Sequence, residues 1–343
     1  MQRGEVTVKN QEYVLASRPK GTPTAENFRL IESDLPKLKD GEFLIRTLFV
    51  SVDPYMRGRM NDAKSYVPPF QIDQPISGGA IGQVIESMNP SFHVGDIISG
   101  TFNWALYFVS DGRGVHKVNP NLGPLTTNLG VLGMPGLTAY FGLLDIGKPK
   151  AGETVVVSGA AGAVGMAVGQ IAKIHGCRVV GIAGSDEKLR ILTEEMGFDA
   201  GINYKTASSL YTAIRETCPN GVDVYFDNVG GDVTDAVLPN LNDNARIPLC
   251  GQISLYNLDK VDVGPRNLSY VLIHRALIKG FIVSDYARQF GEAFPKLAEW
   301  VTSGQLKYRE TVVEGFENIP NAFLGLFRGE NIGKQLVKVA DVQ

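Results

Sequence analysis

The N-terminal part of the chain consists of short apolar runs separated by glycine and proline. From Glu12 to about Leu132 these runs are rich in β-branched and aromatic residues. Four of them are expected to be strands: 42–52, 80–86, 96–102 and 104–109. Closely spaced short strands with turn residues between them are typical of an all-β unit. The pattern predicts a β-rich domain with the form of a distorted barrel.

The pattern changes at Gly130. Residues 132–145 form an entry turn and an amphipathic helix, and after them apolar runs of strand length alternate with longer stretches of helical period. The expected strand and helix pairs are 154–158 with 164–175, 178–182 with 186–196, and 222–227 with 233–241. Strands alternating with helices indicate a parallel sheet covered on both faces. We therefore expect a doubly wound α/β domain, whose first strand, 154–158, is apolar throughout and hence buried on both faces.

The C-terminal tail returns to the β pattern. It reads as a strand over 307–313, a helix over 320–328 and a strand over 334–339, and we expect it to rejoin the first domain. The predicted domains are 1–129 with 305–343, β-rich, and 130–304, doubly wound. The length of 343 residues agrees with two domains of about 100 to 200 residues each.

Charge and cysteine content exclude several classes of protein. Lys and Arg total 33 against 36 for Asp and Glu, so there is no positive field to attract nucleic acid. Three cysteines without a CxxC pair and four scattered histidines provide no structural zinc site of ordinary spacing. Few and odd cysteines suit a reducing compartment, and no run approaches 18 apolar residues. We expect a soluble cytoplasmic protein that is not a membrane protein.

A glycine-rich loop follows the strand 154–158 and opens a helix. In the sequence Gly159-Ala-Ala-Gly-Ala-Val-Gly165, Gly162 lets the backbone approach a pyrophosphate and Gly165 lets helix and strand pack closely. The loop carries Ala160 where the common GxGxxG pattern has its first glycine. The alternative is that small residues only permit tight packing. Because a strand precedes the loop and a helix follows it, the context favours a dinucleotide site.

The end of the second strand indicates which dinucleotide is bound. An NAD site places an acid there, about 20 residues after the loop, to hold the ribose 2′-hydroxyl. This chain has Gly184-Ser185, and the acids that follow, Asp186 and Glu187, are explained by the first turn of a helix capped by Ser185. Lys188 lies one turn inside that helix and could neutralise a 2′-phosphate. The corner favours NADPH over NADH.

Several segments in order resemble a known family. They are 53–60 (DPYMRGRM), 133–140 (GMPGLTAY), 159–165, 184–188 (GSDEK), 225–231 (YFDNVGG), 250–257 (CGQISLYN), 280–286 (GFIVSDY) and 331–334 (NIGK). With them the chain resembles the zinc-independent medium-chain dehydrogenases/reductases. The branch is that of alkenal double-bond and prostaglandin or leukotriene reductases, and the nearest group is the bacterial NADPH-dependent curcumin/dihydrocurcumin reductases. The resemblance implies a Rossmann NADPH-binding domain and a GroES-like β-barrel catalytic domain, with the active site in the cleft between them.

The resemblance also implies a set of cofactor-binding residues. Pyrophosphate would be held by Gly162, Ala163, Val164 and Gly165. The 2′-phosphate corner would comprise Gly184, Ser185, Lys188 and Tyr204. Ribose and nicotinamide would be lined by Asn228, Cys250, Gly251, Ser254, Tyr256, Phe281, Ile282 and Val283, and Asn331 would bind the carboxamide.

The chemistry follows from what the sequence lacks. Zinc-dependent relatives hold a catalytic metal with a cysteine and a Gly-His-Glu segment, but this chain has Asp53-Pro-Tyr55 at the first place and no Gly-His-Glu anywhere. No metal site is therefore expected. Hydride would then go to a substrate that is electrophilic without a metal, such as an α,β-unsaturated ketone or aldehyde. Hydride addition at its β-carbon leaves an enolate oxygen, which needs hydrogen-bond donors. Tyr256, matched to the family's active-site tyrosine, is the expected donor.

Other assignments leave alternatives open. Tyr256 could instead be a core tyrosine with a satisfied hydroxyl, and either it or water could protonate the α-carbon. Tyr55, Tyr66 and Tyr286 could line an aromatic substrate cleft or cover the domain seam. Cys250 is expected to be a buried small hydrophobe beside the cofactor.

Three functions are compatible with the sequence. The favoured one is an NADPH-dependent ene-reductase acting on enones and enals such as curcumin, dihydrocurcumin, alkenals and prostaglandin-like enones. An NADPH quinone oxidoreductase is the second. A catalytically idle NADPH-binding sensor is the third. The partner is a small-molecule substrate, and the family suggests a homodimer through the doubly wound domains.

Overall fold

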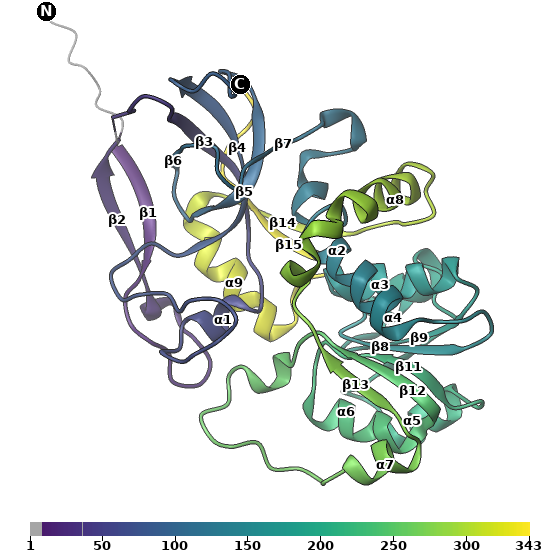
Figure 1. Ribbon diagram of the computed structural model, residues 1–343. Helices are drawn as coiled ribbons and strands as arrows, with labels where there is room; N and C mark the ends of the chain where they lie inside the picture. The colour runs from purple at the N-terminus through teal and green to yellow at the C-terminus, as the bar shows by residue number, and fades with distance from the viewer. Residues whose placement is uncertain (1–8, 36) are drawn as a thin grey trace, which may run out of the picture. The chain divides into compact units, whose positions relative to one another are not determined.

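The computed structural model describes residues 9–35 and 37–343, which group into two compact units. Unit 1 contains the chain up to Leu129 with Val312–Arg328 and Gln335–Gln343, and unit 2 contains Gly130–Thr311 with Gly329–Lys334. The chain therefore passes between the units four times (Figure 1). Residues 305–311 and 329–334, assigned above to the β-rich domain, group with unit 2.

Unit 1 is a β domain whose described strand pairings are antiparallel. Its two sheets are a hairpin of β1 with β2 and a seven-stranded sheet in the order β14-β15-β3-β4-β5-β7, with β6 on β3. The strands are β1 (Lys9–Leu15), β2 (Phe28–Asp34), β3 (Phe43–Ser51), β4 (Ser77–Ser87), β5 (Ile97–Asn103), β6 (Tyr107–Ser110), β7 (His116–Lys117), β14 (Glu310–Glu314) and β15 (Lys334–Lys338). The C-terminal strand β15 pairs with β3 and so belongs to the sheet of unit 1.

The core of unit 1 forms around Trp104. Its indole lies 6.0 Å from the Phe28 ring and 6.0 Å from the Phe323 ring, centroid to centroid, and Phe323 belongs to α9 (Ile319–Arg328). The predicted strand 104–109 begins only at Tyr107. The apolar pattern at Trp104 therefore reflects burial of its side chain in the core and not strand structure, since the backbone bends there before β6 begins. The other helix of this unit is the short α1 (Met56–Arg59).

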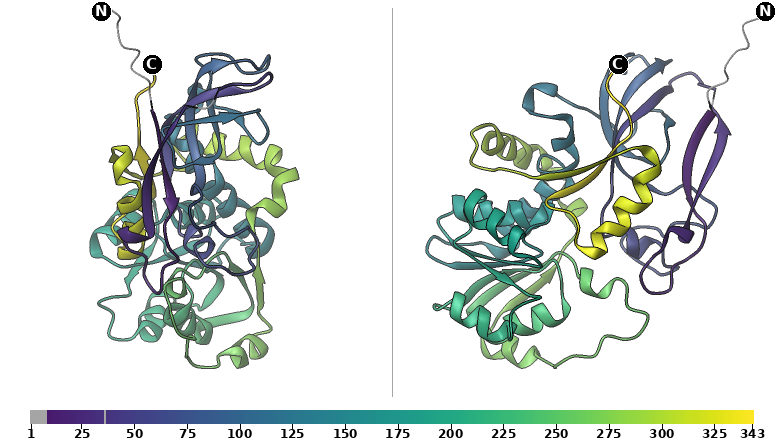
Figure 2. Two further views of the ribbon diagram at one scale, coloured as in Figure 1. Left: turned by 90° about the vertical axis from the view of Figure 1, so that its left-hand side faces the viewer. Right: turned by 180° about the vertical axis from the view of Figure 1, so that it is seen from behind.

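Unit 2 is a doubly wound α/β domain, as predicted. Its six strands are parallel in the order β10-β9-β8-β11-β12-β13. The strands are β8 (Thr154–Ser158), β9 (Arg178–Ala183), β10 (Ala200–Asn203), β11 (Val222–Phe226), β12 (Leu241–Leu249) and β13 (Leu277–Gly280). The helices are α2 (Met134–Phe141), α3 (Ala163–Ile174), α4 (Asp186–Arg190), α5 (Leu210–Thr217), α6 (Gly231–Val237), α7 (Leu268–Ile273) and α8 (Phe290–Thr302). In Figures 1 and 2, α3 and α4 cover one face of this sheet and α5 and α6 the other.

The strand order of unit 2 changes direction at β8. After β8 the chain runs outward through β9 and β10 and then returns to the other side of β8 at β11. In doubly wound sheets, ligands bind beyond the carboxyl ends of the strands at this switch point. All five residues of β8 are buried, as predicted from its unbroken apolar pattern. The loops after β8 and β11 therefore meet where a dinucleotide would bind.

Two helices of the structure have bounds that differ from the predicted ones. The predicted helix 186–196 is α4 up to Arg190, followed by a wider turn over Ile191–Glu195. The predicted helix 233–241 begins at Gly231 and gives way to β12 at Leu241. In the described part of the chain, no helix combines the length and the apolar character needed to cross a membrane.

Candidate active site

The glycine loop after β8 has the geometry expected of a pyrophosphate-binding turn. Gly162 is the N-cap of α3, and Gly159 has a φ of 57°, which favours glycine. A Cβ at Gly165 would stand 2.4 Å from the Gly159 carbonyl oxygen and 2.7 Å from Ala160 Cα. No side chain fits there without moving the backbone. The loop therefore brings the start of α3, with Ala163 and Val164, against its own strand and leaves backbone N–H groups at the helix end.

The predicted N-cap at Ser185 is present in the corner after β9. The Ser185 hydroxyl accepts a hydrogen bond from the Lys188 backbone N–H at 3.3 Å, so Ser185 is the N-cap of α4. A Cβ at Gly184 would stand 2.9 Å from the Tyr204 hydroxyl, so glycine is what lets the Tyr204 ring lie against this corner. The structure thus brings together all four residues assigned to the 2′-phosphate.

Lys188 makes a contact that the sequence did not reveal. Its Nζ donates a hydrogen bond to the Gly329 carbonyl at 2.7 Å, joining α4 to the tail segment of unit 2. Burial lowers the pKa of the Lys188 ammonium, and the nearby positive charge of Lys205 lowers it further, against the opposing effect of Glu187. Two cations that repel one another at an exposed corner favour an anion between them.

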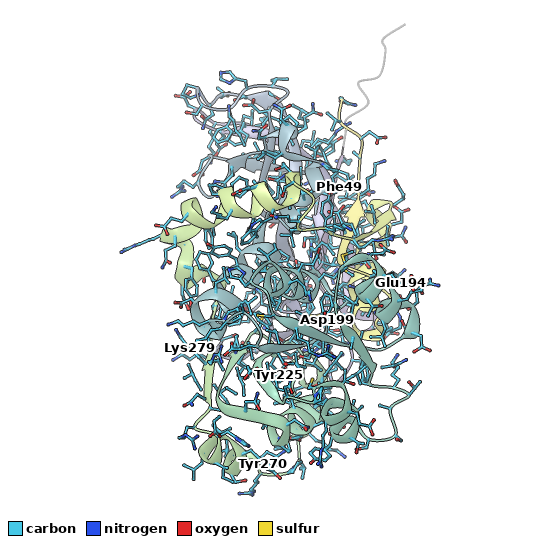
Figure 3. All side chains as sticks on the ribbon, turned by 90° about the vertical axis from the view of Figure 1, so that its right-hand side faces the viewer. Phe49, Glu194, Asp199, Tyr225, Tyr270 and Lys279 are labelled. Atoms are coloured by element: carbon cyan, nitrogen blue, oxygen red, sulfur yellow. The ribbon has the colours of Figure 1, made fainter. Side chains whose placement is uncertain are left out.

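The loop after β11 is fixed by a fully buried carboxylate, Asp227. It accepts hydrogen bonds at 2.6–3.1 Å from three hydroxyls and two backbone N–H groups. These donors are Ser158 Oγ, Tyr225 Oη, Thr234 Oγ1 and the N–H groups of Val229 and Gly230. Figure 3 labels Tyr225 within the sheet of unit 2. Sequence reasoning assigned Asp227 no role, although a polar residue ends each of two neighbouring buried segments, Ser158 in β8 and Asp227 after β11.

Asn228 ties the two loops together. Its backbone N–H donates to Ser158 Oγ at 2.9 Å and its side-chain amide donates to the Ser158 carbonyl at 2.8 Å. The segment after β12 attaches to the same place, since the N–H groups of Cys250 and Gly251 donate to the Asp227 carbonyl at 2.9 and 3.1 Å. Ser254 Oγ then donates to the Val229 carbonyl at 2.6 Å. The predicted residues Asn228, Cys250, Gly251 and Ser254 therefore lie together.

The environment of Cys250 favours the protonated thiol. Although the residue is partly exposed, its thiol is enclosed, and burial together with the charge of Asp227 raises the pKa of the thiol to about 12. A thiol is nucleophilic mainly as its thiolate. The prediction of a small hydrophobe beside the loop agrees with this environment.

The Tyr256 hydroxyl accepts a hydrogen bond but donates none to the described residues. Its hydroxyl oxygen accepts a hydrogen bond from the Gln252 backbone N–H at 3.3 Å, and a Cβ at Gly251 would stand 3.2 Å from that oxygen. Among the described residues, none accepts the hydroxyl proton of Tyr256. Burial raises the pKa of Tyr256, reinforced by Cys250 and Asp227 and opposed by the Gln252 N–H. The phenol is therefore a neutral donor available to a ligand.

The residues assigned to the nicotinamide in the loop after β13 and on the tail differ in how far their side chains are exposed. The Phe281 side chain is buried against Phe226, with the ring centroids 6.3 Å apart, and a Cβ at Gly142 would touch it at 2.4 Å. Phe281 could thus offer a ligand its backbone but not its ring, whereas Ile282 and Val283 are partly exposed. Asn331 lies on the tail segment, and its amide donates to the Gly333 carbonyl at 2.8 Å.

The three further tyrosines have different environments. Tyr286 is buried, its ring stacks on Phe141 at 4.6 Å, and its hydroxyl donates to Asp145 at 2.6 Å. Its donor is therefore occupied inside unit 2. Tyr55 and Tyr66 belong to unit 1, where Tyr55 is largely enclosed and Tyr66 is 60% exposed.

Arg59 was missed by the sequence analysis. Its guanidinium lies 3.9 Å from the centre of the Phe70 ring and donates to the Pro68 carbonyl at 3.0 Å. Burial and the charge of Asp53 raise the pKa of Tyr55, and the Arg59 cation opposes this effect. The segments 53–60 and 66–70 are thus linked through one cation. The signal that could have identified Arg59 is its spacing, since it is a basic residue four positions after Tyr55.

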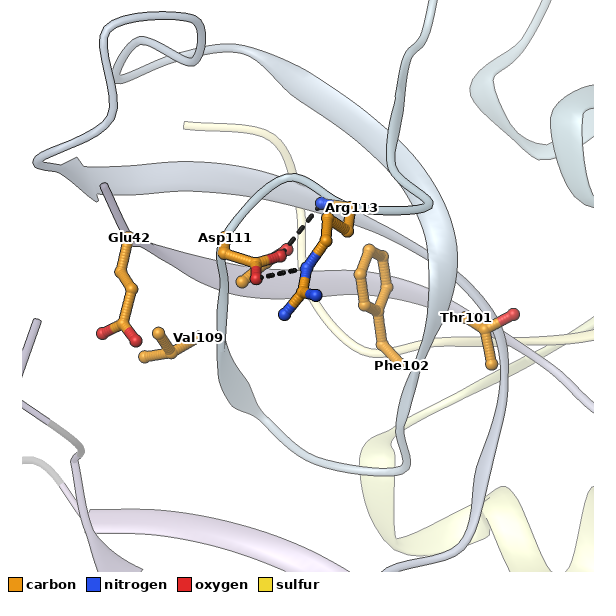
Figure 4. Close-up of a pocket in the computed structure, with 7 residues that line it drawn as sticks. Glu42, Thr101, Phe102, Val109, Asp111 and Arg113 are labelled. Carbon is orange, nitrogen blue, oxygen red and sulfur yellow. Dashed lines mark hydrogen bonds and ion pairs between the residues drawn. The ribbon is translucent and has the colours of Figure 1, made fainter. Parts of the chain in front are cut away.

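A separate pocket in unit 1 contains none of these residues. It has a volume of about 310 Å³ and is shown in Figure 4. Its lining residues are Glu42, Thr101, Phe102, Val109, Ser110, Asp111 and Arg113. Arg113 donates to Asp111 at 2.7 Å and is 91% exposed, so this pair of charges is matched within the pocket and open to solvent. Nothing in its chemistry points to a reaction.

No metal centre emerges from the described ranges, 9–35 and 37–343. No three His, Cys, Asp or Glu side chains in them converge as a metal site would require, and the three cysteines are free.

Comparison with known proteins gives close relatives that match almost the whole chain. A Bacillus subtilis (strain 168) protein, YfmJ, assigned as an NADP-dependent oxidoreductase, is 56% identical over 338 residues, covering 98% of this chain and 99% of its own. The NADPH-dependent curcumin reductase of Escherichia coli (strain K12) is 46% identical, with 98% and 99% covered. Prostaglandin reductase 1 of Sus scrofa is 43% identical, with 96% and 99% covered.

Solved structures and family models agree with these relatives. CurA from Vibrio vulnificus, crystallised in complex with NADPH, is 46% identical with a TM-score of 0.92, covering 96% of this chain and 99% of its own. Two family models match: an N-terminal domain of oxidoreductase over residues 11–118 and a zinc-binding dehydrogenase over residues 163–303. The chain therefore belongs to the medium-chain dehydrogenase/reductase family, in the branch that contains the curcumin and prostaglandin reductases.

Proposed function

We propose that this protein is an NADPH-dependent reductase that saturates the C=C bond of α,β-unsaturated ketones and aldehydes. The observation that carries the proposal is Tyr256, a neutral phenol whose oxygen is held by a backbone N–H while its proton has no acceptor among the described residues. Such a donor suits a carbonyl oxygen on which negative charge develops. The names of the relatives, curcumin reductase and prostaglandin reductase, support substrates of this class.

The cofactor half of the reaction rests on residues of unit 2. The start of α3, from Gly162 to Gly165, would receive the pyrophosphate, and Lys188 with Tyr204 would receive the 2′-phosphate. Asn228 and the segment Cys250–Tyr256 would line the ribose and nicotinamide. When bound, NADPH would supply the hydride. The NADPH complex of Vibrio vulnificus CurA supports this choice of cofactor.

Tyr256 would hold the substrate carbonyl by donating its hydroxyl proton in a hydrogen bond. The donor would stabilise the enolate oxygen that forms as hydride reaches the β-carbon, and a well-placed donor is worth about 3 to 4 kcal/mol in such a step. Because the Gln252 N–H binds the phenol oxygen, the ring cannot turn away without losing that bond. The backbone therefore orients the donor before substrate arrives.

The substrate class is proposed to be apolar and aromatic. Tyr55, Tyr66 and the Arg59–Phe70 pair give unit 1 a set of rings and one cation within a short stretch of sequence. Among these rings Tyr66 is 60% exposed, so aryl enones such as curcumin and dihydrocurcumin would stack on it. Alkenals and prostaglandin-like enones are the other members of the proposed class.

The deciding experiment follows NADPH oxidation across small enals, aryl enones, prostanoid-like ketones and quinones. The proposal expects enone turnover with the carbonyl retained and deuteride from 4-deuterated NADPH at the β-carbon. Allylic alcohol as the product would overturn it. A quinone rate far above every enone rate would assign the protein to quinone reduction instead. NADPH binding without turnover of any member of the panel would indicate a sensor.

We also propose that the protein is a homodimer formed through unit 2. The sheet ends at β13, and in the described part of the chain no strand pairs with its outer edge. Apolar side chains around that edge are exposed: Leu268 (73%), Leu272 (79%), Ile273 (60%), Leu277 (49%) and Ile278 (38%). Figure 3 labels Lys279 on β13 and Tyr270 on α7. An open edge beside an apolar patch favours pairing with a second copy. A monomer in light scattering at micromolar concentration would contradict this.

The three free cysteines also support a reducing compartment, and we propose the cytoplasm.

A further inference from the structure

The tail segment Gly329–Lys334, here called the strap, belongs to unit 2 although the residues before and after it belong to unit 1. Its C-terminal half is held by backbone bonds. The Gly333 N–H donates to the Ala161 carbonyl at 2.8 Å, and the Lys334 N–H donates to the Arg309 carbonyl at 2.9 Å. Gly333 also forms a β-bridge with Gly162, inside the pyrophosphate loop. This end of the strap is therefore fixed to the element that would hold the pyrophosphate.

The backbone around Gly333 leaves no space for a side chain at this position. Its φ is 69°, and a Cβ there would stand 1.8 Å from the Arg309 carbonyl oxygen. Both backbone groups of the neighbouring Ile332 form hydrogen bonds with the Thr311 side chain. The Ile332 N–H donates to Thr311 Oγ1, and the Ile332 carbonyl accepts from the same hydroxyl, each at 2.9 Å. The C-terminal half of the strap is thus immobilised by short backbone contacts.

The N-terminal end of the strap is held by a side chain. Lys188 Nζ donates to the Gly329 carbonyl at 2.7 Å, across 141 positions of sequence. Gly329 has a φ of 69°, the left-handed conformation that commonly ends a helix, and it directly follows α9. Lys188 is the residue proposed to bind the 2′-phosphate. The two ends of the strap are therefore attached to the two proposed phosphate-binding elements.

Asn331 lies between these two attachments. It is the residue proposed to bind the nicotinamide carboxamide, and its own amide donates to the Gly333 carbonyl at 2.8 Å. Its position depends on the path of the strap, and that path depends on the attachment at each end. An ammonium group carries three donors, so one can go to Gly329 and the others to a phosphate at the same time.

We infer that Lys188 is a positioning residue for the nicotinamide end of the cofactor as well as a binding residue for its 2′-phosphate. Through the Gly329 carbonyl it sets the strap, and through the strap it sets Asn331. This inference rests on the proposed cofactor. It predicts that loss of Lys188 weakens the binding of a nicotinamide even when no 2′-phosphate is present.

Two ligands without a 2′-phosphate test this. NADH contains the nicotinamide, and ADP-ribose is the same molecule without it. In isothermal titration calorimetry, Lys188→Ala should weaken NADH binding about three- to tenfold, the range expected for one lost hydrogen bond, and change ADP-ribose binding less than twofold. Lys188→Arg retains a cationic donor and should recover at least part of the NADH affinity. Arg190→Ala removes the other basic side chain of α4 and should change neither affinity.

Turnover provides a second readout. With saturating NADH and an enone, Lys188→Ala should lower kcat and not only raise KM, because a misplaced carboxamide misplaces the nicotinamide. The inference is overturned if Lys188→Ala leaves NADH affinity unchanged, since Lys188 would then act only on the 2′-phosphate. It is also overturned if NADH and ADP-ribose weaken equally, since the damage would then lie at the adenosine end.

The binding measurement separates this inference from the proposed function. Failure of the wild-type protein to reduce any enone would refute the proposed function, and the ratio of NADH to ADP-ribose affinity would still be readable. Conversely, normal enone turnover with equal losses for both ligands would refute only the role of Lys188 in positioning.

Discussion

The two proposed phosphate-binding regions of unit 2 are built in opposite ways. The loop Gly159–Gly165 consists of backbone and small side chains, and at Gly165 not even one more carbon fits. The corner around Lys188 and Tyr204 consists of long side chains, with Tyr204 44% exposed. A site made of close-packed backbone should fail completely when one atom is added. A site made of exposed side chains should lose affinity by degrees.

The largest expected effect is at the backbone-built loop. Gly165→Ala would place a Cβ 2.4 Å from the Gly159 carbonyl oxygen, so the loop must open and α3 must move off β8. We expect no measurable NADPH binding by calorimetry and a lower Tm, since overpacking costs about 1 to 3 kcal/mol.

The matched control is Gly291→Ala in α8. No atom lies within 4 Å of a Cβ built at Gly291, and alanine favours a helix more than glycine does. Its Tm should be unchanged or slightly higher. If Gly165→Ala bound NADPH normally, the contrast between the two regions would not hold.

The next effect concerns a single hydroxyl. Tyr256→Phe keeps the ring and removes the donor, so kcat on a conjugated enone should fall roughly ten- to a thousandfold while NADPH affinity changes little. Tyr211→Phe, which removes the hydroxyl of an exposed tyrosine, is the control. Wild-type kcat in Tyr256→Phe would assign the enolate charge to another donor, such as the cofactor ribose or Tyr55.

The side-chain-built corner should show a graded effect. The wild-type protein should prefer NADPH over NADH by tenfold or more in kcat/KM. Lys188→Ala should reduce kcat/KM for NADPH roughly ten- to a hundredfold, with the larger part in KM and a smaller part in kcat from the displaced nicotinamide. Steady-state kinetics with both cofactors would measure this. Equal use of the two cofactors by the wild type would contradict 2′-phosphate recognition at the corner.

A smaller effect is expected from pH. Burial raises the pKa of Tyr256 above the ordinary value of about 10, so the phenol keeps its proton where an exposed tyrosine begins to lose it. The kcat for an enone should therefore stay within about twofold between pH 7 and pH 9.5. An alkaline loss with a midpoint near pH 8 that disappears in Tyr256→Phe would show that the pKa is lowered.

The smallest expected effect is that of a chelator. Neither region relies on a metal ligand set, so prolonged dialysis against EDTA should leave kcat unchanged, and elemental analysis should find well under one zinc per chain. Activity lost on chelation and restored by zinc would contradict the metal-free reading.

The sequence predicted the parts of the site that depend on neighbouring residues. The strand, glycine loop and helix around Gly162 follow one another along the chain, and the cap at Ser185 involves a residue three positions away. In both cases the geometry is local, so residue type and spacing suffice. The parallel sheet was predictable for a related reason, because strands and helices alternate with a regular period.

The parts that the sequence did not reveal depend on distant residues. Lys188 and Gly329 are 141 positions apart, Tyr286 and Asp145 also 141, and Ser158 and Asp227 69. No spacing rule links such pairs, and only the fold decides which hydroxyls reach Asp227. Similarly, the resemblance to the family proposes Phe281 as a cofactor contact but could not indicate that its ring fills the space beside Gly142.

The fourfold passage of the chain between the two units constrains how such enzymes can be recombined. A chimaera that exchanged only residues 130–311 with a relative would receive a cofactor unit without its own Gly329–Lys334, and the foreign loop would have to pair with the six residues left behind. Those six residues carry Gly333, which bridges the glycine loop, and Asn331. The proposed cofactor site is therefore not encoded as one continuous block of the gene. An exchange that transfers it intact must take two separate pieces, the second only six codons long.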